Sequence, residues 1–149
     1  MGVTGDSPVA VRAWVAAGAW MLLILWLSSD QFSANTTGSL LQRLLAFLGA
    51  ELTRGALHAV HFAVRKAAHL AEYAVLGALT LRALASSVPN RRAPLWAWLL
   101  ALCVALVDEG YQSTSPVRTG SLRDVGVDGV GALIGVAAQT LRAAKRSAR

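Results

Sequence analysis

The chain has 149 residues, of which 55% are apolar and only 15% are charged, and its mean hydropathy is +0.50. A soluble domain usually carries about 25% charged residues, so this composition excludes an ordinary soluble globule, a disordered tail and a solvated coiled coil. The net charge is +6 at pH 7, but the basic residues lie singly or in pairs between apolar runs, without the continuous basic patch of nucleic-acid-binding proteins. We therefore expect a membrane protein surrounded by the lipid bilayer, with no nucleic acid as partner.

Four weakly charged runs predict transmembrane helices, at about residues 12–29, 66–86, 93–112 and 124–141. The apolar core of each run is shorter than the roughly 20 residues that cross a bilayer. Flanking Arg and Lys side chains must therefore extend to the membrane surface. No small-residue cleavage site follows the first run, so we expect a retained helix and not a cleaved signal peptide. The prediction is an all-α polytopic membrane protein, a single domain over residues 1–149 with a four-helix transmembrane bundle.

The first outer loop contains a segment, about residues 39–64, that begins with leucines at helical spacing opposite polar residues. This pattern predicts an amphipathic helix that lies on the outer leaflet or caps the bundle. A helix that binds a partner protein is the alternative. The Lys and Arg residues favour the side of the two termini, which predicts a multi-pass protein of the bacterial inner membrane with both termini in the cytoplasm.

Polar side chains form a stripe on the second predicted span. Residues 56–85 contain no proline, so one long helix can run from the loop into the membrane. Five polar residues of this helix fall within an arc of roughly 80° at helical spacing, and two more flank it: His58, His61, Arg65, His69 and Glu72, then Lys66 and Tyr73.

Two further polar clusters are predicted at the same, outer end of the bundle. They are Asp108, Glu109 and Gln112 on the third span, and Asp124 and Asp128 on the fourth. Gly131 and Gly135 form a G-x-x-x-G pattern that lets a neighbouring helix approach closely and turns the Asp128 face inward. Ionised residues in membrane helices are costly unless they are paired or hydrated. A purely structural ion-pair network is the alternative, but three converging clusters favour a functional site.

The motifs resemble those of the VanZ-like membrane proteins. The segment Lys66–Gly77 matches K-x-x-H-x-x-E-Y-x-x-L-G, Asp108–Gln112 matches D-E-x-x-Q, and Pro116–Arg118 matches P-x-R. The segment from Asp124 to Gly131 matches D-x-x-x-N-x-x-G, except that Asp128 stands where the family usually has Asn. An additional carboxylate at that place calls for a proton or an extra cation.

The resemblance implies a bacterial inner-membrane protein that acts at the cell envelope. The founding member of the family is associated with low-level resistance to the glycopeptide antibiotic teicoplanin, and most relatives have no known activity. A contribution of this chain to glycopeptide resistance is therefore an analogy at the level of the family.

Three functions fit these residues. The first is a non-enzymatic envelope protein whose outer polar cleft binds an amphiphile, such as a lipid-linked cell-wall precursor, or a membrane partner. Arg65, Lys66, Arg118 and Arg123 would then hold phosphate or carboxylate groups. The candidate ligand-binding residues are Lys66, His69, Glu72, Tyr73, Asp108, Glu109, Gln112, Arg118, Asp124 and Asp128.

The second function is a membrane enzyme in which His69 is the general base, oriented by Glu72, and Asp108 or Glu109 is an acid or a metal ligand. The third is a proton-coupled transporter with a relay through Glu72, His69 and Asp128, although the charged residues gather at one end and not at the midplane. No established metal or cofactor motif is present, so we predict no cofactor. The identity of any bound ion and the oligomeric state stay open.

Overall fold

The computed structural model describes residues 7–32, 34–49, 52–87, 91–116 and 120–148, and within these ranges all regular secondary structure is helical. This confirms the predicted all-α fold. The elements in chain order are α1 (Pro8–Leu27), the 3-10 helix η1 (Asp30–Phe32), α2 (Ala34–Phe47), α3 (Arg54–Ser87), α4 (Ala93–Ser113) and α5 (Leu122–Ser147).

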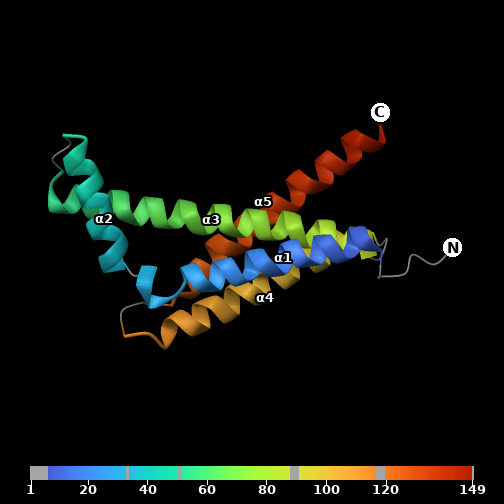
Figure 1. The fold of residues 1–149 in the computed structure, drawn as a ribbon, viewed down its shortest axis with the longest axis horizontal. Helices are drawn as coiled ribbons and strands as arrows, with labels where there is room; N and C mark the ends of the chain where they lie inside the picture. The colour runs from blue at the N-terminus through green and yellow to red at the C-terminus, as the bar shows by residue number, and fades with distance from the viewer. Residues whose placement is uncertain (1–6, 33, 50–51, 88–90, 117–119, 149) are drawn as a thin grey trace.

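Helices α1, α3 and α4 follow the long axis of the molecule with alternating direction, and α5 crosses them obliquely (Figure 1). Helix α3 packs against α1, α4 and α5, most extensively against α5. Helix α2 lies across one end, beside the start of α3. Helix α1 begins and α5 ends at the opposite end of the molecule (Figure 1). Helices α1, α3, α4 and α5 thus reverse direction from one to the next, and the chain passes along this axis an even number of times.

Local sequence signals explain where two of these helices begin. Ser7 precedes α1, where its hydroxyl accepts a hydrogen bond of 3.2 Å from the backbone N–H of Ala10, and Pro8 follows at the first helical position. Ser121 precedes α5 and accepts from the backbone N–H of Arg123 at 3.1 Å. These caps satisfy N–H groups that have no partner within the helix.

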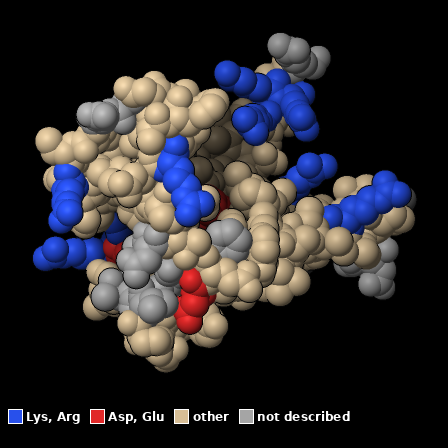
Figure 2. Space-filling view, turned by 60° about the vertical axis from the view of Figure 1, so that its left-hand side comes forward, with Lys and Arg blue, Asp and Glu red and all other residues tan. Residues whose placement is uncertain are grey.

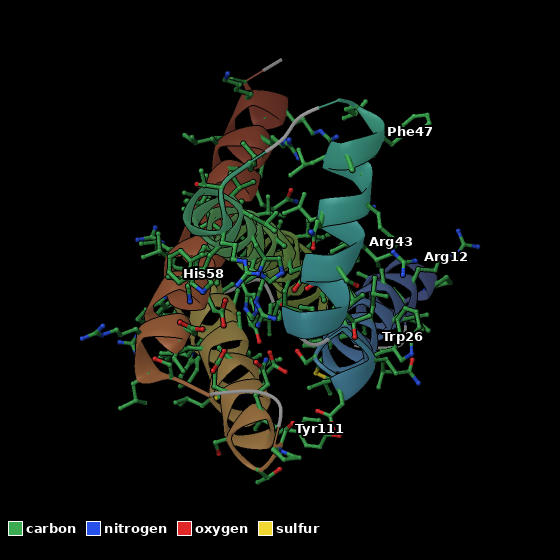
Figure 3. The ribbon with its side chains drawn as sticks, turned by 90° about the vertical axis from the view of Figure 1, so that its left-hand side faces the viewer. Arg12, Trp26, Arg43, Phe47, His58 and Tyr111 are labelled. Atoms are coloured by element: carbon green, nitrogen blue, oxygen red, sulfur yellow. The ribbon has the colours of Figure 1, made fainter. Side chains whose placement is uncertain are left out.

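The predicted outer segment, residues 39–64, is divided between two helices. Helix α2 ends at Phe47, shortly before Gly49, which has a φ of 71°. Glycine adopts this left-handed conformation without the steric cost that other residues pay, so the chain turns there. Phe47 is 87% exposed and points away from the other helices (Figure 3).

The long second helix is confirmed, because α3 runs without interruption from Arg54 to Ser87. Its first turns extend beyond the bundle, where α2 contacts them.

Two of the described helices, α1 and α4, are long and apolar enough to cross a membrane. Only 22% and 33% of their apolar windows are buried, so most of this apolar surface is available to lipid. Helices α3 and α5 are longer but less apolar, because charged residues such as Glu72 and Arg82 on α3 and Asp128 on α5 lie within the predicted spans. The prediction of four spans is therefore supported for two helices.

Glycines bring α3 and α5 into backbone contact. A Cβ atom added at Gly131 would overlap the carbonyl oxygen of Leu70, and one at Gly135 would overlap that of Ala74. Gly77 makes the reciprocal approach from α3 toward Ala132. This confirms the close approach predicted from the G-x-x-x-G pattern, and Asp128, one turn before Gly131, is fully buried.

Two tryptophans link helices α1 and α4 to this α3–α5 pair by hydrogen bonds. The indole N–H of Trp20 on α1 donates to the carbonyl of Glu72 at 2.8 Å, and that of Trp98 on α4 donates to the carbonyl of Gly129 at 2.9 Å. Both acceptors belong to the helix segments that carry the predicted polar clusters, so these bonds hold the four helices in register around them.

Candidate functional site

The described part of the chain buries three carboxylates at the end of the bundle where α1 ends and α5 begins. Asp108 and Glu109 on α4 are 0% and 5% exposed, and Asp128 on α5 is 0% exposed. On the face shown in Figure 2, Lys and Arg side chains project outward, whereas fewer acidic atoms reach the surface. The sequence placed these residues at one end of the bundle, and the structure brings them into its interior.

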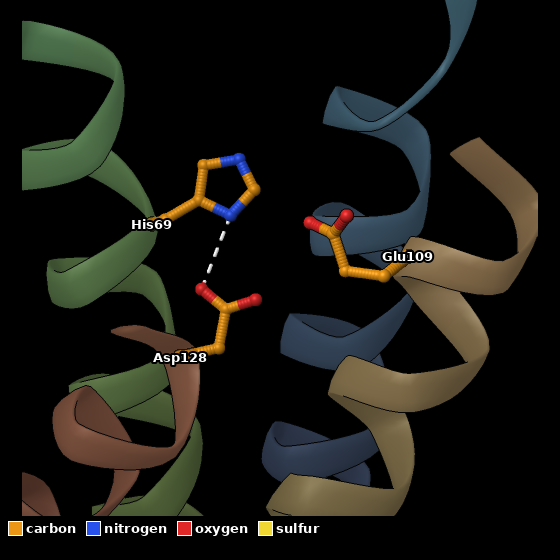
Figure 4. Close-up of side chains that lie close together, drawn as sticks. All are labelled: His69, Glu109 and Asp128. Atoms are coloured by element: carbon orange, nitrogen blue, oxygen red, sulfur yellow. Dashed lines mark hydrogen bonds and ion pairs between the residues drawn. The ribbon is translucent and has the colours of Figure 1, made fainter. Parts of the chain in front are cut away.

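His69, Glu109 and Asp128 converge from three helices, α3, α4 and α5 (Figure 4). One potential ligand atom of each lies within 4.8 Å of the other two. His69 Nδ1 and Asp128 Oδ1 form a hydrogen-bonded pair at 3.1 Å, and the Glu109 carboxylate faces this pair from the opposite side (Figure 4).

The structure gives His69 a hydrogen-bond partner other than Glu72, the residue predicted to orient it. The hydrogen-bond partner of His69 Nδ1 is Asp128, and Glu72 lines a neighbouring cavity. Residues three apart on one helix share a face, which was the reason to pair His69 with Glu72. The partner comes instead from α5, because Gly131 lets the backbones of α3 and α5 approach each other closely.

Asp108 belongs to a separate buried network. Its Oδ2 accepts from the hydroxyl of Tyr73 at 3.4 Å and from Nε2 of Gln112 at 3.2 Å. The Gln112 amide also donates to Oγ of Ser28 at 3.2 Å. This network joins α1, α3 and α4, and three of its members are sequence-predicted site residues.

Glu109 is oriented by the start of α5. The backbone N–H of Ser121 donates to Oε2 of Glu109 at 2.7 Å. The preceding residue, Gly120, lies against the carbonyl of Glu109 so closely that a Cβ atom would overlap it. The contribution of Ser121 was missed by sequence reasoning, because a backbone N–H leaves no signal in the residue type.

Each of the three buried carboxylates keeps one oxygen without a hydrogen-bond partner among the described residues. These atoms are Asp108 Oδ1, Glu109 Oε1 and Asp128 Oδ2. A buried polar atom without a partner costs free energy, and a buried charge costs more. Such atoms are completed in proteins by a water molecule, a cation or a ligand, or the acid carries a proton.

The basic residues of the predicted site differ in their location and in their partners. Lys66 forms an ion pair with Asp124, and its ammonium also lies 5.3 Å from the centre of the Phe62 ring. Arg123 is exposed on α5. Arg118 lies outside the described residues. Of these cations, Arg65 is the one that faces a cavity beside His69.

This cavity has a volume of about 160 Å³ and lies between the end of α1, α2 and α3. Its lining combines apolar and polar groups, from Leu27, Ser28, Thr37, Arg65, Ala68, His69 and Glu72. It connects the exposed surface to His69, whose side chain is 14% exposed. The sequence analysis did not predict that Thr37 of α2 lines this cavity.

His61 attaches α2 to the beginning of α3. Its Nε2 lies 2.8 Å from the hydroxyl of Thr37. Partial burial lowers the pKa of His61 from its ordinary 6.5, and the positive charges of Arg65 and His58 lower it further. The neutral imidazole is therefore the form that the folded arrangement favours.

We predict that the attachment of α2 weakens on acidification. A base whose pKa is lower in the folded state contributes full stability above its unfolded pKa, here about 6.5, and loses it as the pH falls below that value. Hydrogen exchange of the α2 amides, corrected for the intrinsic pH dependence, is expected to accelerate between pH 7.5 and pH 5. His61→Gln is expected to remove this acceleration and His58→Gln to preserve it. Equal behaviour of the two variants would contradict the assignment.

The fold and the buried cluster together define an all-helical protein, with two helices apolar enough for a membrane, that gathers carboxylates and a histidine in its interior. A family model, VanZ/LLP1, matches residues 13–142. The chain belongs to the VanZ/LLP1 family, which confirms the resemblance found in its motifs. No curated protein and no solved structure matches the chain.

Proposed function

We propose that this protein is a multi-pass protein of the bacterial inner membrane that binds the headgroup of a phosphate-bearing envelope amphiphile in the cavity beside His69. In this proposal α1, α3, α4 and α5 all cross the membrane and both termini are cytoplasmic. Family membership and the two apolar helices support the location in a membrane. A contribution to glycopeptide resistance is part of the same proposal and is drawn from the family.

The observation that carries the proposal is the position of Arg65. Arg65 lines the 160 Å³ cavity and has no ion-pair partner among the residues that the structure places. Lys66, its neighbour, is already neutralised by Asp124. A guanidinium that faces a cavity offers several donors in a fixed geometry, which suits phosphate oxygens.

The shape of the lining fits an amphiphile. Leu27 at the end of α1 and Ala68 on α3 supply apolar wall, while Ser28 and His69 supply hydrogen-bonding groups. Exposed apolar side chains of α1, such as Leu22 and Trp26, continue from this end of the helix. An alkyl chain that leaves the cavity along α1 would therefore stay in contact with apolar surface.

A second candidate function is acid–base catalysis on the same amphiphile. The observation in its favour is the hydrogen bond between His69 and the buried Asp128, because a carboxylate that fixes one imidazole nitrogen prepares the other for proton transfer. The transporter hypothesis has less support, since the described carboxylates gather at one end of the bundle.

Native mass spectrometry of the detergent-purified protein tests the binding proposal. The probes are a polyprenyl phosphate and the polyprenol of the same chain length. We expect the phosphate form to be retained and Arg65→Met to weaken its retention by about tenfold or more, the range of a lost charge-assisted hydrogen bond of 1.5–3 kcal/mol. Mass analysis of the released probe also reports catalysis, because a binder returns it unchanged.

Arg43→Met is the matched control, since Arg43 is an exposed cation on α2 that does not line this cavity. It is expected to retain the polyprenyl phosphate like the unmodified protein. Equal retention of the phosphate and the polyprenol would overturn the proposal. The same conclusion would follow if Arg65→Met and Arg43→Met behaved alike.

A further inference from the structure

We propose that His69, Glu109 and Asp128 form a binding site for one divalent transition-metal ion of the Zn²⁺ type. This inference goes beyond the proposed binding of an amphiphile and does not depend on it. Its first basis is position, because α3, α4 and α5 each contribute one donor group and the donor atoms lie within 4.8 Å of one another (Figure 4).

The second basis is the pair of carboxylate oxygens that the described residues leave without a partner. Asp128 uses Oδ1 for His69 and leaves Oδ2 free, and Glu109 uses Oε2 for the N–H of Ser121 and leaves Oε1 free. Both residues are at least nine-tenths buried. The bond from Ser121 is of the outer-shell kind that orients a ligand carboxylate in metal sites. A nitrogen that donates its hydrogen cannot also bind a metal ion, so an ion bound through Nδ1 of His69 would replace the His69–Asp128 hydrogen bond.

The local charge also favours a cation when both carboxylates are ionised. With a neutral imidazole, the two carboxylates carry a charge of about −2, which a divalent ion would balance. Lys66, one of the cations of the predicted site, is paired with Asp124. Buried like charges without compensation are strongly unfavourable, and a metal ion would convert their repulsion into coordination.

The donor set indicates the class of metal. One imidazole nitrogen and two carboxylate oxygens suit Zn²⁺ or Mn²⁺, whereas Cu⁺ prefers sulfur ligands and Mg²⁺ and Ca²⁺ prefer oxygen ligands alone. Metal bonds of about 2.0–2.2 Å would place the ligand atoms roughly 3.3–3.6 Å apart. The three side chains therefore need to close inward by rotation about their own bonds.

The site has an entry path and room for a further ligand. His69 lines the 160 Å³ cavity, so an ion can reach the cluster from the surface. Three protein ligands leave a fourth position of a tetrahedral ion open. In such a site that position takes water or an oxygen of a bound molecule.

Cobalt substitution tests this inference without any added lipid. The purified protein is stripped with a chelator and titrated with Co²⁺ alone, and the visible absorption and the bound metal per chain are measured. We expect one Co²⁺ per chain with the intense absorption of low-coordinate cobalt, displaced by Zn²⁺. Asp128→Asn and Glu109→Gln are expected to weaken binding by more than the 10- to 100-fold typical of outer-shell changes.

Two controls separate this cluster from other metal-binding residues. Asp30→Asn removes an exposed carboxylate that bonds to Ser115, and a His58→Ala/His61→Ala double variant removes the other two histidines of the chain. Both are expected to bind Co²⁺ like the unmodified protein. The inference is overturned if Co²⁺ keeps the weak spectrum of the hydrated ion, or if the double variant abolishes binding.

Folding of the variants is checked by thermal unfolding of the metal-free proteins, and either isosteric variant alone is sufficient for the test. Retention of Co²⁺ by a folded Asp128→Asn or Glu109→Gln protein at the original affinity would also overturn the site. Because no amphiphile is present, failure of the polyprenyl phosphate experiment leaves this result unaffected.

Discussion

Replacement of Gly135 by alanine is expected to lower the free energy of unfolding by about 3 kcal/mol or more, the upper range for forcing extra volume into a packed interior. The new Cβ would overlap the carbonyl of Ala74, which is backbone and cannot rotate away. Helices α3 and α5 would have to separate along their whole contact. Thermal unfolding followed by circular dichroism in detergent measures the loss.

Gly126→Ala is the matched control on the same helix. Nothing lies within 4 Å of a Cβ added at Gly126, and alanine is favoured over glycine in a helix by about 0.8–1.0 kcal/mol. This substitution is expected to leave the unfolding temperature unchanged or to raise it. If both substitutions lowered it equally, the close approach of α3 and α5 would not be what holds the bundle together.

Replacement of Tyr73 by alanine is expected to cost about 3–5 kcal/mol, as for other large aromatic residues in a packed interior. Tyr73 is fully buried, contacts the core cluster that includes Ile24 and Leu76, and donates to Asp108. In lipid, lost van der Waals contacts and the cavity left behind carry most of this effect. Chemical denaturation or thermal unfolding measures it.

Two further variants separate the contributions of the Tyr73 ring and hydroxyl to stability and provide an exposed control. Tyr73→Phe keeps the ring and removes the hydroxyl, so about 1 kcal/mol is expected. Tyr111→Ala removes a tyrosine that is exposed on α4, and a change within about 0.5 kcal/mol is expected. A Tyr73→Ala protein as stable as Tyr111→Ala would show that the buried network contributes nothing to the fold.

The elements with clear periodicity were predictable from the sequence. The unbroken polar stripe of α3 predicted one long helix, and the structure contains it from Arg54 to Ser87. The spacing of Gly131 and Gly135 predicted a close helix contact with Asp128 on the inner face, and both features are present. These predictions depend only on the period of the α-helix, which is the strongest signal that a sequence carries.

The turn after α2 was harder to predict, because a single left-handed residue at Gly49 interrupts a leucine pattern that otherwise continues. The four membrane spans could not be established either. The residues that make the interior polar, such as Glu72 and Asp128, also reduce the apolar character of α3 and α5. A helix that carries polar residues into the interior therefore gives a weaker hydropathy signal for a membrane span.

Partners within the site could not be read from the sequence, because they depend on contacts between helices. The sequence placed Asp108 and Glu109 side by side, yet the first joins Tyr73 and Gln112 while the second turns toward His69 and Ser121. Neighbouring residues point about 100° apart on a helix. Which of them meets which partner is decided by the packing of α4 against α3 and α5.

The connection between α4 and α5 does more than join two helices. At its end, Gly120 rests on the backbone of Glu109, and the next residue both caps α5 and grips the Glu109 carboxylate. The residue that caps the last helix therefore also positions the Glu109 carboxylate. A substitution at Gly120 or Ser121 would therefore displace a buried acid without replacing it.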